Sequence, residues 1–288
     1  ARRGKVVYFE AIGYRDPSAK TPMTTDTIFN IASMTKPVTA VAALQLLEEG
    51  RLLMGDPVGK YFPPLGTSKV AVMDPSGETI VSTVPANRAI TIQDLFRHTS
   101  GLVYGDRGRT AVHKLYPGGS GSAGDMTGAE FVAKLGSLPL MYQPGTVWDY
   151  GFGLDVLGLV VEQLSQRTLG QYFEQHIFQP LGMTDTGFVV PTSKVPRFAR
   201  ALPKDPESGA TQTVNPRTTP AKFECGGGCL SSTAADYLRF ALMLRQSGRL
   251  GTARVLAPKT VDKLVAKGLV AYFSLAGYYA TTTSTFVQ

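Results

Sequence analysis

Ser33 and Lys36 are the residues whose types and spacing first suggest chemistry. They stand three positions apart in NIASMTKPVTAVAALQLLEEG, residues 30–50, and the apolar stretch 37–47 that follows predicts a helix buried on all sides. Residues three apart on a helix share a face, so the Lys36 amine can reach the Ser33 hydroxyl. Burial disfavours the ammonium form and makes the amine a proton acceptor near neutral pH. The pair predicts an activated serine nucleophile, and a Lys36 that reaches solvent is the alternative.

A second group of candidate residues lies in QPGTVWDYGFGLDVLG, residues 143–158. The glycines that flank Tyr150 let the backbone approach closely, and Trp148 and Tyr150 point the same way if the stretch is extended. A phenol near the serine and lysine could relay the serine proton to a leaving group. We predict Tyr150 as the third catalytic residue, with Trp148 and Phe152 making the substrate pocket apolar. An ordinary half-buried tyrosine is the alternative.

Other serine chemistry is disfavoured by the sequence. No G-x-S-x-G nucleophile elbow is present, because GGSGSAG at 118–124 lacks the final glycine at the required position. The chain has 3 histidines, His98, His113 and His176. The segments around His98 and His176 favour packing or capping roles over that of a base. A Ser-His-Asp hydrolase is therefore not expected.

The two cysteines, Cys225 and Cys229, enclose three glycines. Two ligands with no nearby histidine do not make a zinc site, and a disulfide framework needs more cysteines. We predict two small buried thiols, and a local disulfide is the alternative.

Composition limits the class of protein further. The 288 residues carry a net charge of +7, but the basic side chains are scattered along the sequence. Because nucleic-acid binders concentrate their basic residues on one surface, no nucleic-acid partner is expected. The longest apolar run is about half of the roughly 20 residues that a membrane span needs. The N-terminus shows no apolar signal-peptide core. We expect a soluble, cytoplasmic protein, with a periplasmic or secreted one as the alternative.

The expected elements place strands at both ends of the chain and helices between them. Strands are predicted in 4–15 and in the tail 268–288, and loops in 55–90, 105–128 and 191–221. Helices are predicted in 91–98, 128–136, 153–166, 169–178 and after the Thr233 and Asp236 capping pair. We therefore predict an α/β lobe from 1–64 and 222–288 and a mainly helical lobe from 65–221.

Five sequence blocks in order resemble one known superfamily. The blocks are IASMTKPVTAVAALQLLEEGRLLMGDPV, LFRHTSGL, PGTVWDYGFGLDVLG, IFQPLGMTDTGF and GGGCLSSTAADYLRFALML. They resemble the serine β-lactamase and penicillin-binding-protein superfamily, whose S-x-x-K signature Ser33 and Lys36 match. Within it, the chain most resembles the class C β-lactamase-like esterases, the family VIII carboxylesterases. The resemblance covers the sequence to about residue 265.

The resemblance implies a fold and a set of roles. The fold is α/β (α+β), with a central antiparallel sheet flanked by helices and an inserted helical lobe. Ser33 would be acylated, Lys36 would activate it and Tyr150 would be the partner base. The Ser33 N–H and a strand-edge N–H would form the oxyanion hole. The resemblance implies no metal or cofactor.

The sequence departs from the superfamily pattern at two places. Phe152 occupies the position of the asparagine in the Y-x-N motif of class C β-lactamases, which favours an esterase. A third motif of the K-T-G, H-x-G or W-G-G type is absent, since Lys259, Thr260 and Val261 lie in a helix-start pattern. The tail matches no block of the family.

We therefore expect a serine carboxylesterase that acts on small-molecule, short-chain esters and also transfers acyl groups. The alternatives are a β-lactamase, a D-amino-acid peptidase or amidase of the same superfamily, and a catalytically silent binding protein with this fold.

Overall fold

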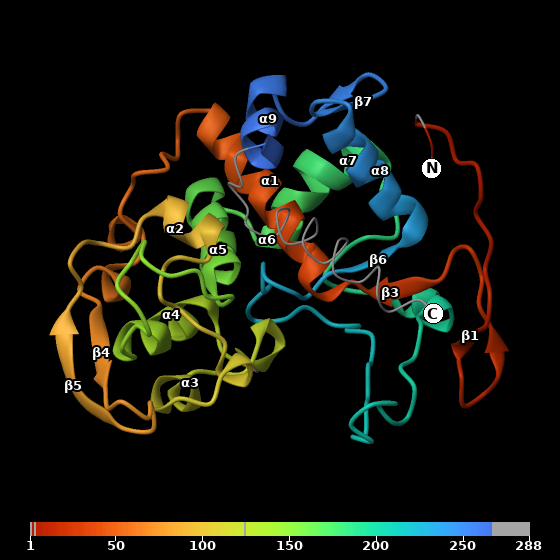
Figure 1. The fold of residues 1–288 in the computed structure, drawn as a ribbon. Helices are drawn as coiled ribbons and strands as arrows, with labels where there is room; N and C mark the ends of the chain where they lie inside the picture. Colours follow the sequence, from red (N-terminus) through yellow and green to blue (C-terminus); the bar gives the residue numbers. More distant parts are fainter. Residues whose placement is uncertain (1, 3, 124, 267–288) are drawn as a thin grey trace.

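The structure, a computed structural model, describes residues 2, 4–123 and 125–266 (Figure 1). The long helix α1, Thr35–Glu48, runs through the middle and packs against α5, Gly153–Ser165, and α6, Leu169–Phe173. Apolar side chains cover every side of α1, and those from Val38 to Leu46 are at most 1% exposed. The predicted buried helix is confirmed. The tail 268–288 lies outside the described residues.

The remaining helices include those predicted at 91–98, at 128–136 and after Thr233. They are α2, Ile92–Arg97; α3, Ala111–Leu115; α4, Gly128–Ser137; α7, Gln179–Leu181; α8, Ala234–Arg245; and α9, Pro258–Ala266. A π-helical turn η6, Glu174–Phe178, joins α6 to α7. Short 3₁₀ helices are η1, Ala32–Met34; η2, Val58–Lys60; η3, Pro63–Leu65; η4, Gly105–Arg107; η5, Ser120–Ala123; and η7, Thr192–Arg197. Threonine side chains cap α2, α3, α4, α6 and α8, as the Thr233 and Asp236 pair predicts for α8.

The strands form antiparallel pairs. The pairs are β1, Tyr14–Asp16, with β2, Thr21–Pro22; β3, Ile28–Asn30, with β6, Ser231–Thr233; β4, Lys69–Met73, with β5, Ile80–Pro85; and β7, Arg249–Leu250, with β8, Ala253–Arg254. The β3–β6 pair joins the first part of the chain to the last and leads directly into η1 and α1. The mixed α/β class is confirmed. Among the described residues each sheet has two strands, so the larger central sheet is not seen there.

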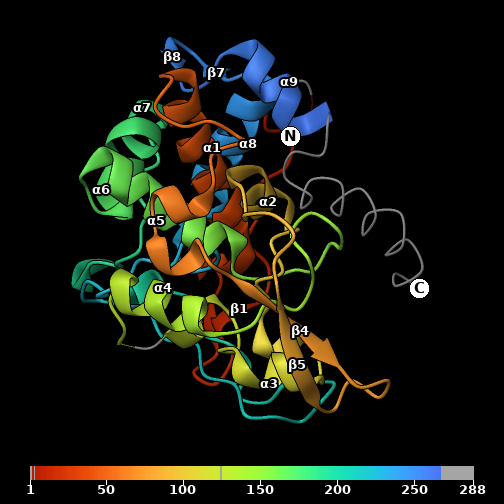
Figure 2. The ribbon, with the colours of Figure 1, turned by 90° about the vertical axis from the view of Figure 1, so that its left-hand side faces the viewer.

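Three predictions of local structure are wrong. The stretch 105–128, predicted as a loop, contains helix α3, in which Val112 is fully buried. The stretch 55–90, predicted as loops, contains the β4–β5 hairpin, which lies at the periphery away from α8 (Figures 1 and 2). Its turn is closed by the Gly77 N–H, which donates to the Asp74 carbonyl at 3.0 Å, so glycine and proline mark the turn of a hairpin. Residues 6–13, predicted as strand, have no regular structure, and Val7 is 69% exposed. The division into two lobes stays a prediction.

Helix α2 is held by a buried carboxylate. Asp94 is 4% exposed and accepts hydrogen bonds from the Thr91 N–H and hydroxyl at 2.9 and 2.7 Å and from the Thr99 hydroxyl at 2.9 Å. The Arg88 guanidinium donates to both of its oxygens at 2.6 and 2.9 Å. Because His98 ends this helix, Asp94 fixes the segment that leads to the site described below.

Replacing Asp94 by alanine tests this anchor. We expect Asp94→Ala to lower the free energy of unfolding by about 2–3 kcal/mol, because it leaves several buried donors without an acceptor. Glu130→Ala is the matched control: the exposed Glu130 completes the capping box of α4, and its loss should cost no more than about 1 kcal/mol. Urea denaturation measures both, and equal losses would contradict the anchoring role of Asp94.

Candidate active site

Ser33 lies on a strained turn directly before α1. It belongs to η1, and the preceding Ala32 has a left-handed backbone with φ of 44°. The Asn30 side chain accepts the Ala32 N–H at 2.9 Å, and the Thr35 hydroxyl donates to the Ala32 carbonyl at 2.7 Å. Non-glycine residues adopt this backbone only where surrounding bonds hold them, and such positions concentrate at functional sites. The turn presents a half-buried Ser33 at the head of the helix.

Lys36 lies one turn later, and its side chain is fully buried. Its amine donates to the Ser33 hydroxyl oxygen at 3.2 Å and to the Gly227 carbonyl at 2.6 Å. It also lies 4.5 Å from the ring centroid of Tyr150 and 5.3 Å from that of Tyr104. The structure therefore brings the three predicted catalytic residues together, and the alternative of a solvent-exposed Lys36 is wrong.

The electrostatic surroundings favour the neutral form of the Lys36 amine. Burial lowers the pKa of Lys36 to about 8; the Asp155 carboxylate opposes this change and the Arg107 guanidinium adds to it. Arg107 is exposed and lies 5.3 Å from the Tyr150 ring centroid. With a pKa of about 8 the amine is still mostly protonated at pH 7, but its neutral fraction is far larger than that of an ordinary lysine, and this fraction can accept a proton.

A buried carboxylate behind the amine is a site feature that the sequence did not predict. Asp155, fully buried on α5, accepts the Tyr104 hydroxyl at 3.0 Å, the Ser120 hydroxyl at 3.0 Å and the Gly227 N–H at 2.9 Å. Burial raises the pKa of Asp155, while Lys36 and these hydrogen bonds lower it. The sequence signal was an acidic residue inside the apolar pattern of 153–166. Tyr104 and Ser120 carried no comparable signal.

Tyr150 is held among aromatic rings. Its ring centroid lies 4.6 Å from that of His98, 5.6 Å from Tyr104 and 6.3 Å from Trp148. His98 caps the end of α2 with a left-handed backbone, and its Nδ1 accepts the Gly151 N–H at 3.3 Å. Burial and the nearby lysine lower the pKa of His98 to about 3, so the ring is neutral. The predicted packing and capping role of His98 is confirmed.

The two predicted substrate-binding residues lie in different environments. Trp148 is 42% exposed beside Tyr150, where a ligand can reach it. Phe152 is fully buried, and its ring lies 4.5 Å from Tyr104 and 5.2 Å from Phe131. Phe152 therefore supports Tyr104 from the core, and its side chain has no surface that a substrate could touch.

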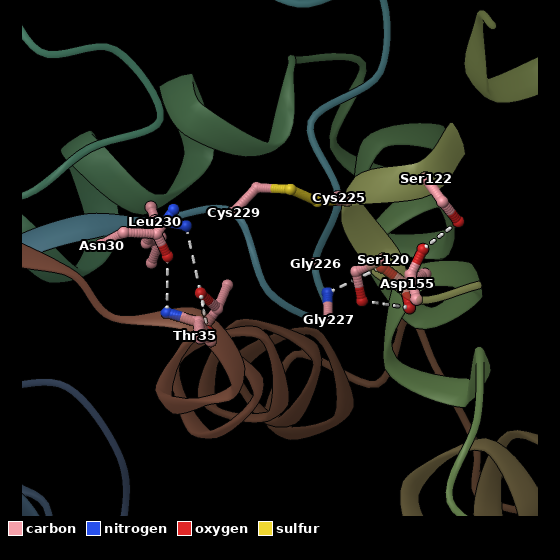
Figure 3. Close-up of a disulfide and its surroundings, with 12 residues drawn as sticks. Asn30, Thr35, Ser120, Ser122, Asp155, Cys225, Gly226, Gly227, Cys229 and Leu230 are labelled. Carbon is pink, nitrogen blue, oxygen red and sulfur yellow. Dashed lines mark hydrogen bonds between the residues drawn. A yellow bond between two sulfur atoms is a disulfide. The ribbon is translucent and has the colours of Figure 1, made fainter. Parts of the chain in front are cut away.

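Cys225 and Cys229 form a disulfide, with their Cα atoms 5.5 Å apart (Figure 3). The preferred prediction of two free thiols is wrong, and the local disulfide that was its alternative is present. The three intervening glycines let the chain turn tightly enough to bring the two cysteines within bonding range.

Neither a metal-binding group nor a membrane-spanning helix is found in the described part of the chain. Residues 2, 4–123 and 125–266 contain no group of three or more His, Cys, Asp or Glu side chains placed to hold a metal ion. Within the same residues, no helix combines the length and apolar character of a membrane span.

Known proteins are similar to this chain in sequence or in fold. Protein Rv1367c of Mycobacterium tuberculosis is 42% identical over 265 residues, which are 90% of this chain and 64% of that protein. Esterase EstB of Burkholderia gladioli is 34% identical over 201 residues, which are 69% of this chain and 47% of the esterase. The structure of EstCE1, a hydrolase with promiscuous acyltransferase activity, superposes with a TM-score of 0.73 at 27% identity, covering 93% of this chain and 71% of EstCE1. The chain thus spans less than two thirds of the length of either relative found by sequence.

The sequence also matches the Beta-lactamase family over residues 1–280. This match includes the Ser33 turn, the buried Lys36 amine and the Tyr150 segment described above. The chain belongs to the Beta-lactamase family.

Proposed function

We propose that this chain is a serine hydrolase that cleaves short-chain carboxylic esters through an acyl-enzyme on Ser33. Transfer of the acyl group to alcohols or amines is its second reaction. The observation that carries the proposal is the hydrogen bond of 3.2 Å between a fully buried Lys36 amine and the Ser33 hydroxyl. An amine with a lowered pKa is the group that such a serine needs for activation.

Acylation begins with transfer of the Ser33 proton to the neutral Lys36 amine. The serine oxygen attacks the acyl carbon, and the carbonyl π electrons move onto its oxygen to give a tetrahedral intermediate. The intermediate collapses, the bond to the alcohol oxygen breaks, and the alcohol leaves with a proton from the lysine and tyrosine pair. Tyr150 is assigned to this relay because its ring lies 4.5 Å from the amine. Water, or an acceptor alcohol or amine, then reverses the sequence and frees Ser33.

The start of α1 supplies one donor for the developing negative charge. Ser33 lies in η1, two residues before α1 begins, and N–H groups at helix starts point toward ligands and favour negative charge. We assign the Ser33 N–H to the oxyanion hole. The second donor, expected on a late strand, is assigned to none of the described residues, and the tail 268–288, for which the sequence predicts a strand, lies outside them.

Two observations favour an ester over a β-lactam or peptide. Phe152, at the position where class C β-lactamases have an asparagine, is fully buried and offers no carboxamide to a substrate amide. The exposed Trp148 next to Tyr150 presents an apolar surface to an acyl chain or an alcohol group. The esterase EstB and the hydrolase EstCE1 add support by similarity.

Replacing the nucleophile tests the proposed function. We expect Ser33→Ala to lower release of nitrophenol from 4-nitrophenyl butyrate by at least about 10³-fold, because the substitution removes the hydroxyl that the Lys36 amine is placed to activate. Ser122→Ala, which alters an exposed serine bonded to the Gly119 carbonyl, is the control and should keep full activity. Mass spectrometry should find one fluorophosphonate per chain, lost only in Ser33→Ala.

Three results would contradict the ester hydrolase. Ser33→Ala with unchanged turnover would remove the nucleophile assignment. Nitrocefin hydrolysis faster than ester hydrolysis would indicate a β-lactamase. Absence of both turnover and the adduct would indicate a catalytically silent binding protein.

The pH dependence tests the role of Lys36. We expect kcat/KM for the ester to rise with pH through about 8, because the neutral amine must accept the serine proton and burial lowers the pKa of Lys36 to about 8. Arg107→Gln removes a positive charge that lowers the pKa of Lys36, so its rising limb should move to higher pH. Arg109→Gln, an exposed neighbour, should leave the limb unchanged. A limb that moves to lower pH in Arg107→Gln would contradict this assignment.

A further inference from the structure

We propose that the Cys225–Cys229 disulfide is a positioning device of the active site. By closing the triple-glycine loop, it holds Gly227 between Lys36 and Asp155, and its reduction lowers the hydrolytic rate. The inference rests on the proposed ester hydrolysis and adds to it a dependence on redox state.

The disulfide-closed loop touches both charged groups of the site through one residue. The Gly227 carbonyl accepts the Lys36 amine at 2.6 Å, and the Gly227 N–H donates to Asp155 at 2.9 Å (Figure 3 shows the second contact). The adjacent Gly226 carbonyl accepts the Thr39 hydroxyl at 2.7 Å, one turn further along α1. The loop is therefore fixed to α1 and α5 at three points.

The backbone at Gly226 and Gly227 lies so close to α5 that only glycine fits at these two positions. A Cβ at Gly227 would collide with the Asp155 carboxylate and the Ser120 hydroxyl, and one at Gly226 would lie 2.7 Å from the Leu154 carbonyl oxygen. Three successive glycines lose more conformational freedom on ordering than any other tripeptide. A disulfide across the three glycines removes most of the alternative conformations of the loop. We therefore infer that the disulfide, and not the glycines themselves, keeps the loop in this conformation.

The bridge can be opened by thiol–disulfide exchange. Cys225 is 2% exposed, whereas Cys229 is half-buried, so an incoming thiolate attacks the Cys229 sulfur. The disulfide bond breaks, and Cys225 leaves as a thiolate that takes up a proton. With a dithiol reductant, its second thiolate then attacks the mixed disulfide and releases Cys229, which is protonated in turn. Two electrons and two protons enter the protein, and the reductant becomes a cyclic disulfide.

Opening the loop has two opposed effects on the amine: loss of the Gly227 carbonyl as a hydrogen-bond acceptor lowers the pKa of Lys36, and entry of water raises it. Burial is the largest cause of the lowered pKa of Lys36, so a loop that relaxes and admits water raises this pKa toward its ordinary value. The other titratable or charged groups that face the amine lie on elements that reduction leaves in place. These groups are Tyr104, Arg107, Tyr150, Asp155 and His98.

The experiment compares the oxidised protein with protein reduced by dithiothreitol after folding. We expect reduction, verified as two titratable thiols per chain, to lower kcat/KM for 4-nitrophenyl butyrate about tenfold near pH 7 and to move the rising limb of the pH profile upward. Reoxidation with diamide should restore both. A Cys225→Ser/Cys229→Ser double variant should match the reduced enzyme and ignore dithiothreitol, which controls for other effects of the reductant.

Hydrogen exchange gives a readout that does not depend on activity. In the oxidised protein the Gly227 amide, bonded to a fully buried carboxylate, should exchange slowly, and reduction should accelerate it at least tenfold while α5 stays protected. Unchanged exchange at Gly227, or an unchanged rate and pH profile in the fully reduced protein, would overturn the inference. An oxidised protein that turns over no ester and takes up no fluorophosphonate would instead overturn the proposed function, and exchange at Gly227 would still decide whether the bridge holds the loop.

Discussion

The burial of one amine is the constraint on which the rest of the site depends. Lys36 has no exposed surface, and an ammonium group in that position is costly unless it is paired or loses its proton. The structure surrounds it with the Gly227 carbonyl, the Ser33 hydroxyl, two tyrosine rings and a more distant carboxylate. The carbonyl and the hydroxyl accept hydrogen bonds from the amine, and the carboxylate compensates its charge only in part. The result is an amine poised between its two protonation states, next to a hydroxyl on a strained turn.

The part of the site that depends on local geometry could be predicted from the sequence. Ser33 and Lys36 lie three positions apart at the head of an apolar helix, and helical periodicity alone brings their side chains together. Tyr150 was indicated by its flanking glycines and by its place in a family block. Asp155 could not be recognised in the same way, because an acidic residue in the first turn of a helix has an ordinary explanation in the helix dipole. Its partner Ser120 lies 35 positions away and becomes a neighbour only through the fold.

In the fold, too, the elements marked by local sequence signals could be predicted, and those that depend on distant contacts could not. The helices that begin at 92, 128 and 234 each follow an N-cap threonine and carry an acidic residue three positions after it, a signal that the sequence contains in full. Strand β5 was missed because nearly all of its side chains are exposed, so it shows no buried alternation. The disulfide was not the preferred prediction, because two cysteines four positions apart can be either free thiols or a disulfide. Only the conformation of the loop through Gly226 and Gly227 shows that the two sulfur atoms are bonded.

The titration of the Lys36 amine itself tests the central claim most directly. Carbon NMR can follow the Lys36 Cε resonance against pH in the substrate-free protein, with the resonance assigned by its loss in Lys36→Arg. Our account predicts a pKa of about 8 for this amine, well below its ordinary 10.5. A titration at the ordinary value would show that the amine remains an ammonium ion near neutral pH, and Lys36 could then not accept the proton of Ser33.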